Sequence, residues 1–198
     1  PTLPLHVYAH NCIAAKNLGS GMDLNDGPYI LRAHVYNNIA YDNGGGGIPG
    51  SSGYGFLDFS ASGPASDRVF RNNIAYLNDN ANFNIYGGSY TSDHNSWDTG
   101  APSFKASDFQ HLDYSQLKAS RKSDGSLPDI TFGKLVTGSN LIDAGVIVGL
   151  PYNGSNPDLG WFETGSETIN PVYVSSVIQN ATPSALELTY SIALANII

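Results

Sequence analysis

The chain has 198 residues, of which only 13% are charged, and it carries a net charge of −8 at pH 7. This acidic balance excludes a nucleic-acid-binding protein, which needs a basic stripe, and it disfavours binding to anionic lipid surfaces. The sequence contains no apolar run long enough to cross a bilayer and no CxxC or HExxH metal motif. Its start, at residues 1–4 (PTLP), suggests a cut within a larger protein.

A seven-residue phrase recurs in the first half of the chain. It reads NCIAAKN at residues 11–17, NNIAYDN at 37–43 and NNIAYLN at 72–78, with a fainter copy, HNSWD, at 94–98. A valine and an aromatic residue precede each of the three full copies. Internal repeats at such intervals indicate stacked units that share one core.

The repeats predict an all-β protein, a parallel β-helix, over residues 1–100. Each unit has a short β-rich run, an Asn-rich turn and a loop rich in Gly, Asn and Asp, and the runs are too short for helices. In such a solenoid equivalent side chains stack, so Ile13, Ile39 and Ile74 are expected to form an internal ladder. The asparagines beside them are expected to form an amide ladder that bonds the backbone of the turns.

Residues 101–165 change in character, and we expect them to cap the solenoid, because open β-edges invite aggregation. Within this cap, residues 107–113 are expected to start a helix. Residues 141–146 (LIDAGV) and 157–162 (PDLGWF) are expected to form short strands with turns.

Residues 171–198 contain two further strand candidates, at 171–178 and 185–194, with a turn at 180–184 between them. An isolated hairpin is marginal in water. The segment is therefore expected to pair with the cap, or to open a following module, or to support self-association through its strand edges.

The repeats and the cap resemble the right-handed parallel β-helix of secreted bacterial polysaccharide lyases, and above all the C-terminal part of the family 9 pectate lyases of Bacteroidetes. The most specific matches are SDF at 107–109, RKSDGSLPD at 121–129, GSNLIDAG at 138–145 and SNPDLG at 155–160. The resemblance covers residues 5 to about 163, and the tail from residue 171 resembles the start of an Ig-like module.

This resemblance implies a secreted or cell-surface protein that acts on a uronate polysaccharide such as pectate. Family members use a lysine to remove the proton α to the uronate carboxyl, while calcium held by clustered aspartates neutralises that carboxylate. Hard carboxylate oxygens suit calcium, and the developing negative charge needs such stabilisation.

The chain departs from the family pattern at both motifs. The family's Asp-Asp-Gly-aromatic-Asp-Leu run matches residues 19–24 (GSGMDL), where only Asp23 is retained. The family's Gly-Phe-Lys-Leu-Gly-Gly run matches residues 55–60 (GFLDFS), which places Leu57 at the position of the base. We therefore predict no strong lyase activity for this chain alone, and whether it is an enzyme stays open.

The calcium candidates are Asp23, Asp26 and Asp42, which could offer three carboxylates from neighbouring rungs. The alternative is turn chemistry, since Asn-Asp-Gly at 25–27 is a turn signal without any metal.

The catalytic candidates are Lys16, as a base, and Arg68, as a partner of the uronate carboxylate. A base role for Lys16 requires burial or calcium to lower its pKa. The alternatives are an exposed lysine for Lys16 and an ion pair of Arg68 with Asp67 or Asp58.

The substrate-binding candidates are Arg71, which could hold a carboxylate in a bidentate contact, and Tyr41 and Tyr76, whose rings could stack on sugars. The alternative for the tyrosines is stacking within the solenoid.

Two functions follow from this reading. The first is a polysaccharide lyase-like β-helix that acts on or binds an acidic polysaccharide in its parent protein. The second is a non-catalytic structural, adhesive or self-assembling β-helix that binds glycans. Because a polyuronate is itself negative, either function needs bound cations or a local groove of Arg and Lys.

Overall fold

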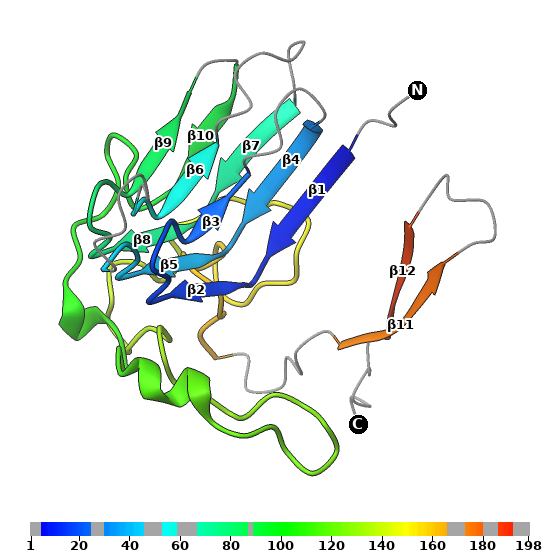
Figure 1. The fold of residues 1–198 in the computed structure, drawn as a ribbon. Coiled ribbons are helices and arrows are strands. Elements are labelled where there is room, and N and C mark those ends of the chain that lie inside the picture. The colour runs from blue at the N-terminus through cyan, green and yellow to red at the C-terminus, as the bar shows by residue number, and fades with distance from the viewer. Residues whose placement is uncertain are drawn as a thin grey trace.

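The computed structural model describes residues 5–24, 30–45, 53–58, 67–86 and 89–165, together with two strands at 173–179 and 186–191. Three stacked parallel sheets dominate the described part of the chain (Figure 1). The first sheet has the order β1 (Leu5–His10), β4 (Ile30–Tyr36), β7 (Asp67–Arg71), β10 (Thr91–Asp93). The second has β2 (Ile13–Ala15), β5 (Ile39–Tyr41), β8 (Ile74–Tyr76), and the third has β3 (Met22–Asp23), β6 (Phe56–Asp58), β9 (Phe83–Ile85).

The chain visits the three sheets in turn, and each circuit places its strands beside those of the circuit before. Strand β1 pairs with β4, β2 with β5 and β3 with β6, all in parallel. This is a parallel β-helix, right-handed as parallel crossover connections are, and it confirms the predicted fold class. The strands are short because each is one side of a circuit that must then turn.

The predicted isoleucine ladder is confirmed in its register, since Ile13 pairs with Ile39 and Ile39 with Ile74. Its position differs from the prediction of an internal ladder. Ile39 and Ile74 pack with the apolar residues of the 101–165 segment, while the alanines beside them, Ala40 and Ala75, face the solenoid interior with Val35, Phe56 and Phe70. The isoleucines therefore form a second core, between the solenoid and its cap.

The predicted amide ladder is confirmed at the turn between the first two sheets. Asn38 donates to Asn73 Oδ1 at 2.9 Å, and Asn73 donates to Asn95 Oδ1 at 2.8 Å. Each amide also donates to the backbone of the neighbouring circuit, as Asn73 does to Val35 O at 2.8 Å. A second amide contact joins Asn43 to Asn78 at the next turn, also at 2.8 Å. The ladder thus satisfies backbone groups that the turns would otherwise bury without partners.

The first residue of each of the four repeated phrases has a left-handed backbone conformation. The φ angles are 54° at Asn11, 51° at Asn37, 58° at Asn72 and 56° at His94. Asparagine tolerates this conformation better than most residues with a side chain. In the two phrases that have paired asparagines, at 37–38 and 72–73, the first asparagine therefore makes the turn and the second joins the rungs.

Residues 101–165 lie over the second sheet and contain two short 3-10 helices, η2 (Ala106–Asp108) and η3 (Tyr114–Lys118). The predicted helix start at 107–113 is only the single turn η2. Asn72 attaches this cap to the solenoid, because it accepts from Val146 N and donates to Val146 O, both at 2.8 Å.

The strands predicted at 141–146 and 157–162 are wrong, because these residues form turns, bends and irregular backbone. Carboxylates bond their backbone instead of a neighbouring strand. Asp143 N donates to Asp158 Oδ1 at 2.9 Å, and Asp158 N donates to Glu163 Oε1 at 3.1 Å. Leu141 and Leu159 are buried as the predicted strand residues would be, yet they anchor turns to the isoleucine ladder.

The predicted hairpin is confirmed as two antiparallel strands, β11 (Tyr173–Gln179) and β12 (Leu186–Ser191). The turn predicted at 180–184 lies outside the described residues. Self-association through residues 171–198 stays a prediction, as does the division of the chain at residues 100 and 165. Within the described residues, no helical segment has the length and apolar character needed to cross a bilayer.

We predict that Asn73→Ala lowers the free energy of unfolding by about 2–4 kcal/mol, because it leaves buried backbone groups of two circuits without partners. Urea denaturation followed by circular dichroism measures this. Asn82→Ala is the control, since Asn82 is exposed. Equal effects of the two substitutions would show that the ladder does not carry the stacking.

Glu163 generates a second prediction, since this acidic residue is only 4% exposed. Burial, aided by the charge of Asp158, raises the pKa of Glu163 from its ordinary 4.5 to about 7, although the backbone N–H of Asp158 opposes the change. The folded chain therefore holds this proton more tightly than the unfolded chain does, and its stability falls as the pH rises from about 4.5 to about 7.

Glu163→Gln is expected to remove this fall, which amounts to about 1–3 kcal/mol. Urea denaturation at the two ends of the pH range measures it. Asp129→Asn is the control, because the Asp129 side chain is 89% exposed. A variant with the same pH dependence as the unsubstituted chain would exclude Glu163 as its source.

Candidate functional site

The third sheet carries the two motifs that depart from the family pattern. Asp23 on β3 pairs in register with Leu57 on β6, and Leu57 with Asn84 on β9. Asp23 is exposed, whereas Leu57 is 1% exposed. A buried leucine has no group that accepts a proton. The described residues of this sheet therefore offer one carboxylate and no base at the matched positions.

Lys16 and Asp42 form an ion pair with each other. Both lie just after strands of the second sheet, with left-handed φ angles of 57° and 50°, so adjacent circuits present them side by side. The Nζ atom of Lys16 also lies 5.6 Å from the centroid of the Tyr114 ring. The hydrogen bond to Asp42 raises the pKa of Lys16. This is the direction opposite to the one that a general base requires.

The three calcium candidates do not form one site in the described part of the chain. Asp42 contacts Lys16, Asp23 lies on β3, and Asp26 lies outside the described residues. Among the described residues, no group of three His, Cys, Asp or Glu side chains is placed to hold a metal ion. The described residues therefore do not fit a calcium site.

Tyr41 and Tyr76 lie under the cap and adjoin each other, with ring centroids 6.1 Å apart. Tyr41 is 9% exposed and meets Phe132 edge-on at 5.5 Å, and Tyr76 lies 5.3 Å from Phe104. The structure thus places both rings in the packing between solenoid and cap, which is the alternative that the sequence left open for them.

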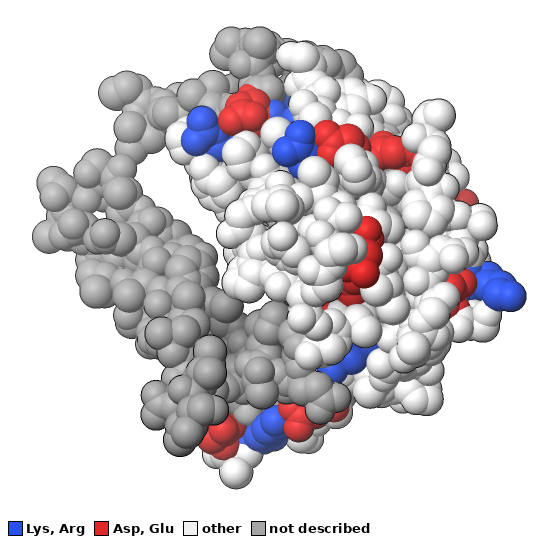
Figure 2. Space-filling view, turned by 180° about the vertical axis from the view of Figure 1, so that it is seen from behind, with Lys and Arg blue, Asp and Glu red and all other residues white. Residues whose placement is uncertain are grey.

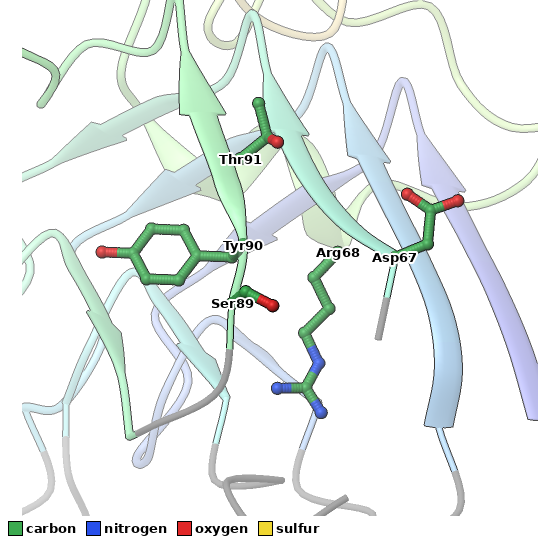
Figure 3. Close-up of a pocket in the computed structure, with 5 residues that line it drawn as sticks. All are labelled: Asp67, Arg68, Ser89, Tyr90 and Thr91. Atoms are coloured by element: carbon green, nitrogen blue, oxygen red, sulfur yellow. The ribbon is translucent and has the colours of Figure 1, made fainter. Parts of the chain in front are cut away.

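Arg68 lies at the edge of the solenoid interior, in an ion pair with Asp58 at 3.0 Å. The side chains are 2% and 0% exposed. On β7, Arg68 points away from Asp67, toward the segment that carries Ser89, Tyr90 and Thr91 (Figure 3). These five residues line an open pocket of about 180 Å³. This ion pair is one of the two alternatives that the sequence left open for Arg68, and a guanidinium suits it because its rigid fork presents several donors.

Arg71 lies on the opposite, outer face of β7. Its Nε and Nη2 atoms donate to Asp93 Oδ2 at 3.1 and 3.0 Å. The structure therefore places the two candidate arginines, Arg68 and Arg71, on opposite faces of β7, as alternation along a strand requires.

Four residues of this outer face were missed as candidates: His34, Asp67, Asp93 and His94. Asp67 and Asp93 contact the arginines of neighbouring strands, and His34 and His94 contact those aspartates. A signal was present, since the polar residues Arg32, His34 and Tyr36 alternate with Ala33 and Val35.

Comparisons with known proteins agree with this fold. No protein-family model matches the chain. Over 152 residues, the chain is 39% identical to pectate lyase L of Dickeya chrysanthemi, a match that covers 76% of this chain and 32% of that protein. Pectate lyase L of Dickeya dadantii is 38% identical over the same length. The crystal structure of pectate lyase Pel9A matches with a TM-score of 0.63 and 32% identity, over 82% of this chain and 37% of that one.

The chain is therefore a parallel β-helix of the kind that polysaccharide-degrading proteins use. More particularly, it is a pectate lyase-like β-helix, and the resemblance to pectate lyases that the cap suggested is confirmed. The chain spans about a third of the length of the curated relatives that it matches.

We predict that the Lys16 amine titrates above the ordinary pKa of lysine and that Asp42→Asn moves its pKa down, because the carboxylate is the main cause of the shift. An NMR titration of the Lys16 side-chain signals measures this, with Asp129→Asn as the control. A Lys16 pKa below the ordinary value would contradict the ion pair and support the base role.

Proposed function

We propose that this chain is the part of a secreted, polysaccharide lyase-like protein that binds a uronate polysaccharide such as pectate. The observation that carries the proposal is the 39% identity to pectate lyase L over most of this chain. In the whole protein, the reaction would be a calcium-assisted β-elimination, which breaks the glycosidic bond after a proton α to the uronate carboxyl is removed.

Within this chain, the proposed binding site is the Arg68 pocket. The Arg68 guanidinium would donate to one uronate carboxylate, while Asp58 holds it in place. Tyr90, which is 47% exposed, would cover the sugar ring from the side of the pocket. The arginine would thus bind the carboxylate of the sugar acid, and the tyrosine ring would contact its sugar ring.

This chain alone is expected to bind without turning over. Leu57 is buried at the matched position of the base, and the ion pair with Asp42 raises the pKa of Lys16. The described residues assemble no calcium site, so calcium and the base are proposed to belong to other parts of the parent protein.

The test is to incubate the chain with polygalacturonate, with and without calcium, at mildly alkaline pH. Release of unsaturated uronates is followed by absorbance, and binding by calorimetry. We expect binding and no calcium-dependent release. Absence of any binding would contradict the proposed function, and release at ordinary enzyme rates would contradict the assignment of catalysis to the rest of the parent.

Tyr90→Ala is expected to weaken binding of polygalacturonate by about fivefold, which is what loss of one stacking ring costs. Tyr152→Ala is the matched control, because Tyr152 is 40% exposed on the cap. Calorimetry at the same alkaline pH measures both variants. Equal losses in the two would place the binding site away from the Arg68 pocket.

A further inference from the structure

The outer face of the first sheet gathers four of the five histidines of the chain. His6 pairs in register with Arg32, and His10 with Tyr36. His34 lies between them on β4, and His94 directly follows β10. The inward residues of β4, Ala33 and Val35, are buried, which shows that the alternating set faces outward.

Two groups with the same composition lie on this face, each with one Arg, one Asp and one His. In the first, Asp67 Oδ2 accepts from Arg32 Nε at 2.9 Å and lies 3.2 Å from His34 Nε2. In the second, Asp93 accepts from Arg71 at 3.0 Å and lies 3.2 Å from His94 Nδ1. Each group is neutral when its histidine is neutral and carries one positive charge when that histidine is protonated.

Partial exposure keeps these groups within reach of a ligand. The side chain of Asp67 is 47% exposed and that of His94 is 48% exposed. Tyr8, which is 58% exposed, meets the His34 ring edge-on at 5.3 Å, and His34 stacks on Tyr36 at 5.4 Å. In the view from behind the ribbon of Figure 1, basic and acidic side chains lie next to one another along the upper part of the molecule (Figure 2). Neutral pairing of this kind gives a polyanion little to bind.

We propose that this outer face is a second binding surface, which takes up an acidic polysaccharide when its histidines are protonated. Histidine side chains gain charge between about pH 7 and pH 5, whereas sugar carboxylates stay ionised there. The charged and titratable groups of the face are His6, Tyr8 and His10 on β1; Arg32, His34 and Tyr36 on β4; Asp67 and Arg71 on β7; and Asp93 with His94 at β10. With neutral histidines the charges of the two Arg and two Asp side chains cancel, whereas protonated histidines leave the face positive.

The chain as a whole cannot supply this attraction. Its net charge is −8 with neutral histidines, and protonation of all five still leaves it negative. A polyanion that binds in mild acid must therefore find a local positive surface. The choice of a polyuronate as the ligand rests on the proposed function, whereas the surface and its proton dependence do not.

The test compares binding of polygalacturonate at about pH 5 and about pH 7.5, without calcium and with a chelator present. The double variant His34→Gln/His94→Gln keeps a hydrogen-bonding side chain at both positions but cannot charge. We expect the unsubstituted chain to bind about tenfold more tightly in acid, and the double variant to show less than about a threefold difference. His111→Gln, at the exposed histidine of the cap, is the control and should behave as the unsubstituted chain.

Fully methyl-esterified pectin, which has the same backbone without the charge, should show no gain in acid. The proposal is overturned if binding of polygalacturonate does not depend on pH, if the double variant keeps the tenfold ratio, or if the uncharged pectin gains equally. These measurements need neither calcium nor turnover and do not involve Tyr90. The acid-dependent binding can therefore be observed even if the alkaline binding test fails, and the alkaline test can succeed even if the acid-dependent binding is absent.

Discussion

The rest of the structure depends on the buried amide ladder at the first turn. A solenoid must turn its chain inside the stack of circuits, where backbone groups have no access to water and must find partners. Asn38, Asn73 and Asn95 meet this constraint together. Asn38 donates to the Asn73 side chain, Asn73 donates to the Asn95 side chain, and all three donate to backbone carbonyls of the neighbouring circuit. This fixes the register of adjacent circuits. Every statement about which side chains share a face follows from it.

The cap decides which faces of the solenoid remain open to ligands. It covers the second sheet through the isoleucine ladder, and it takes Tyr41 and Tyr76 into its own packing. Asn72 joins the two parts through Val146. Within the described residues, no strand residue of the first sheet belongs to this packing with the cap, and its outer face carries exposed charged side chains.

Charge is used sparingly, and in the described part of the chain five Lys or Arg side chains form ion pairs with aspartates. Arg68 and Asp58 pair in the interior, where an unpaired charge would be costly. Lys16 pairs with Asp42, and the two Arg, Asp and His groups cancel on the outer face. An acidic protein of this kind attracts a polyanion only where a local positive charge offsets its overall negative charge. A pre-positioned arginine in a pocket and a face that gains protons are two ways to achieve this.

Local sequence patterns by themselves determined five features of this protein, because each depends on residues that are close together in the chain or on a repeated phrase. These features are the repeat, the register of Ile13, Ile39 and Ile74, the amide ladder, the C-terminal hairpin and the resemblance to pectate lyases. The tertiary structure alone decided which face of each strand lies inside. The alternation of side chains along a strand defines two faces, but it does not show which face points into the solenoid and which the cap covers. In the structure the isoleucines pack against the cap and the alanines face the interior. The tertiary structure also decided which charges pair, and it decided that residues 141–146 and 157–162 are not strands. Asp158 accepts a hydrogen bond from the backbone of Asp143, and Glu163 accepts one from the backbone of Asp158, and no local sequence pattern predicts these contacts.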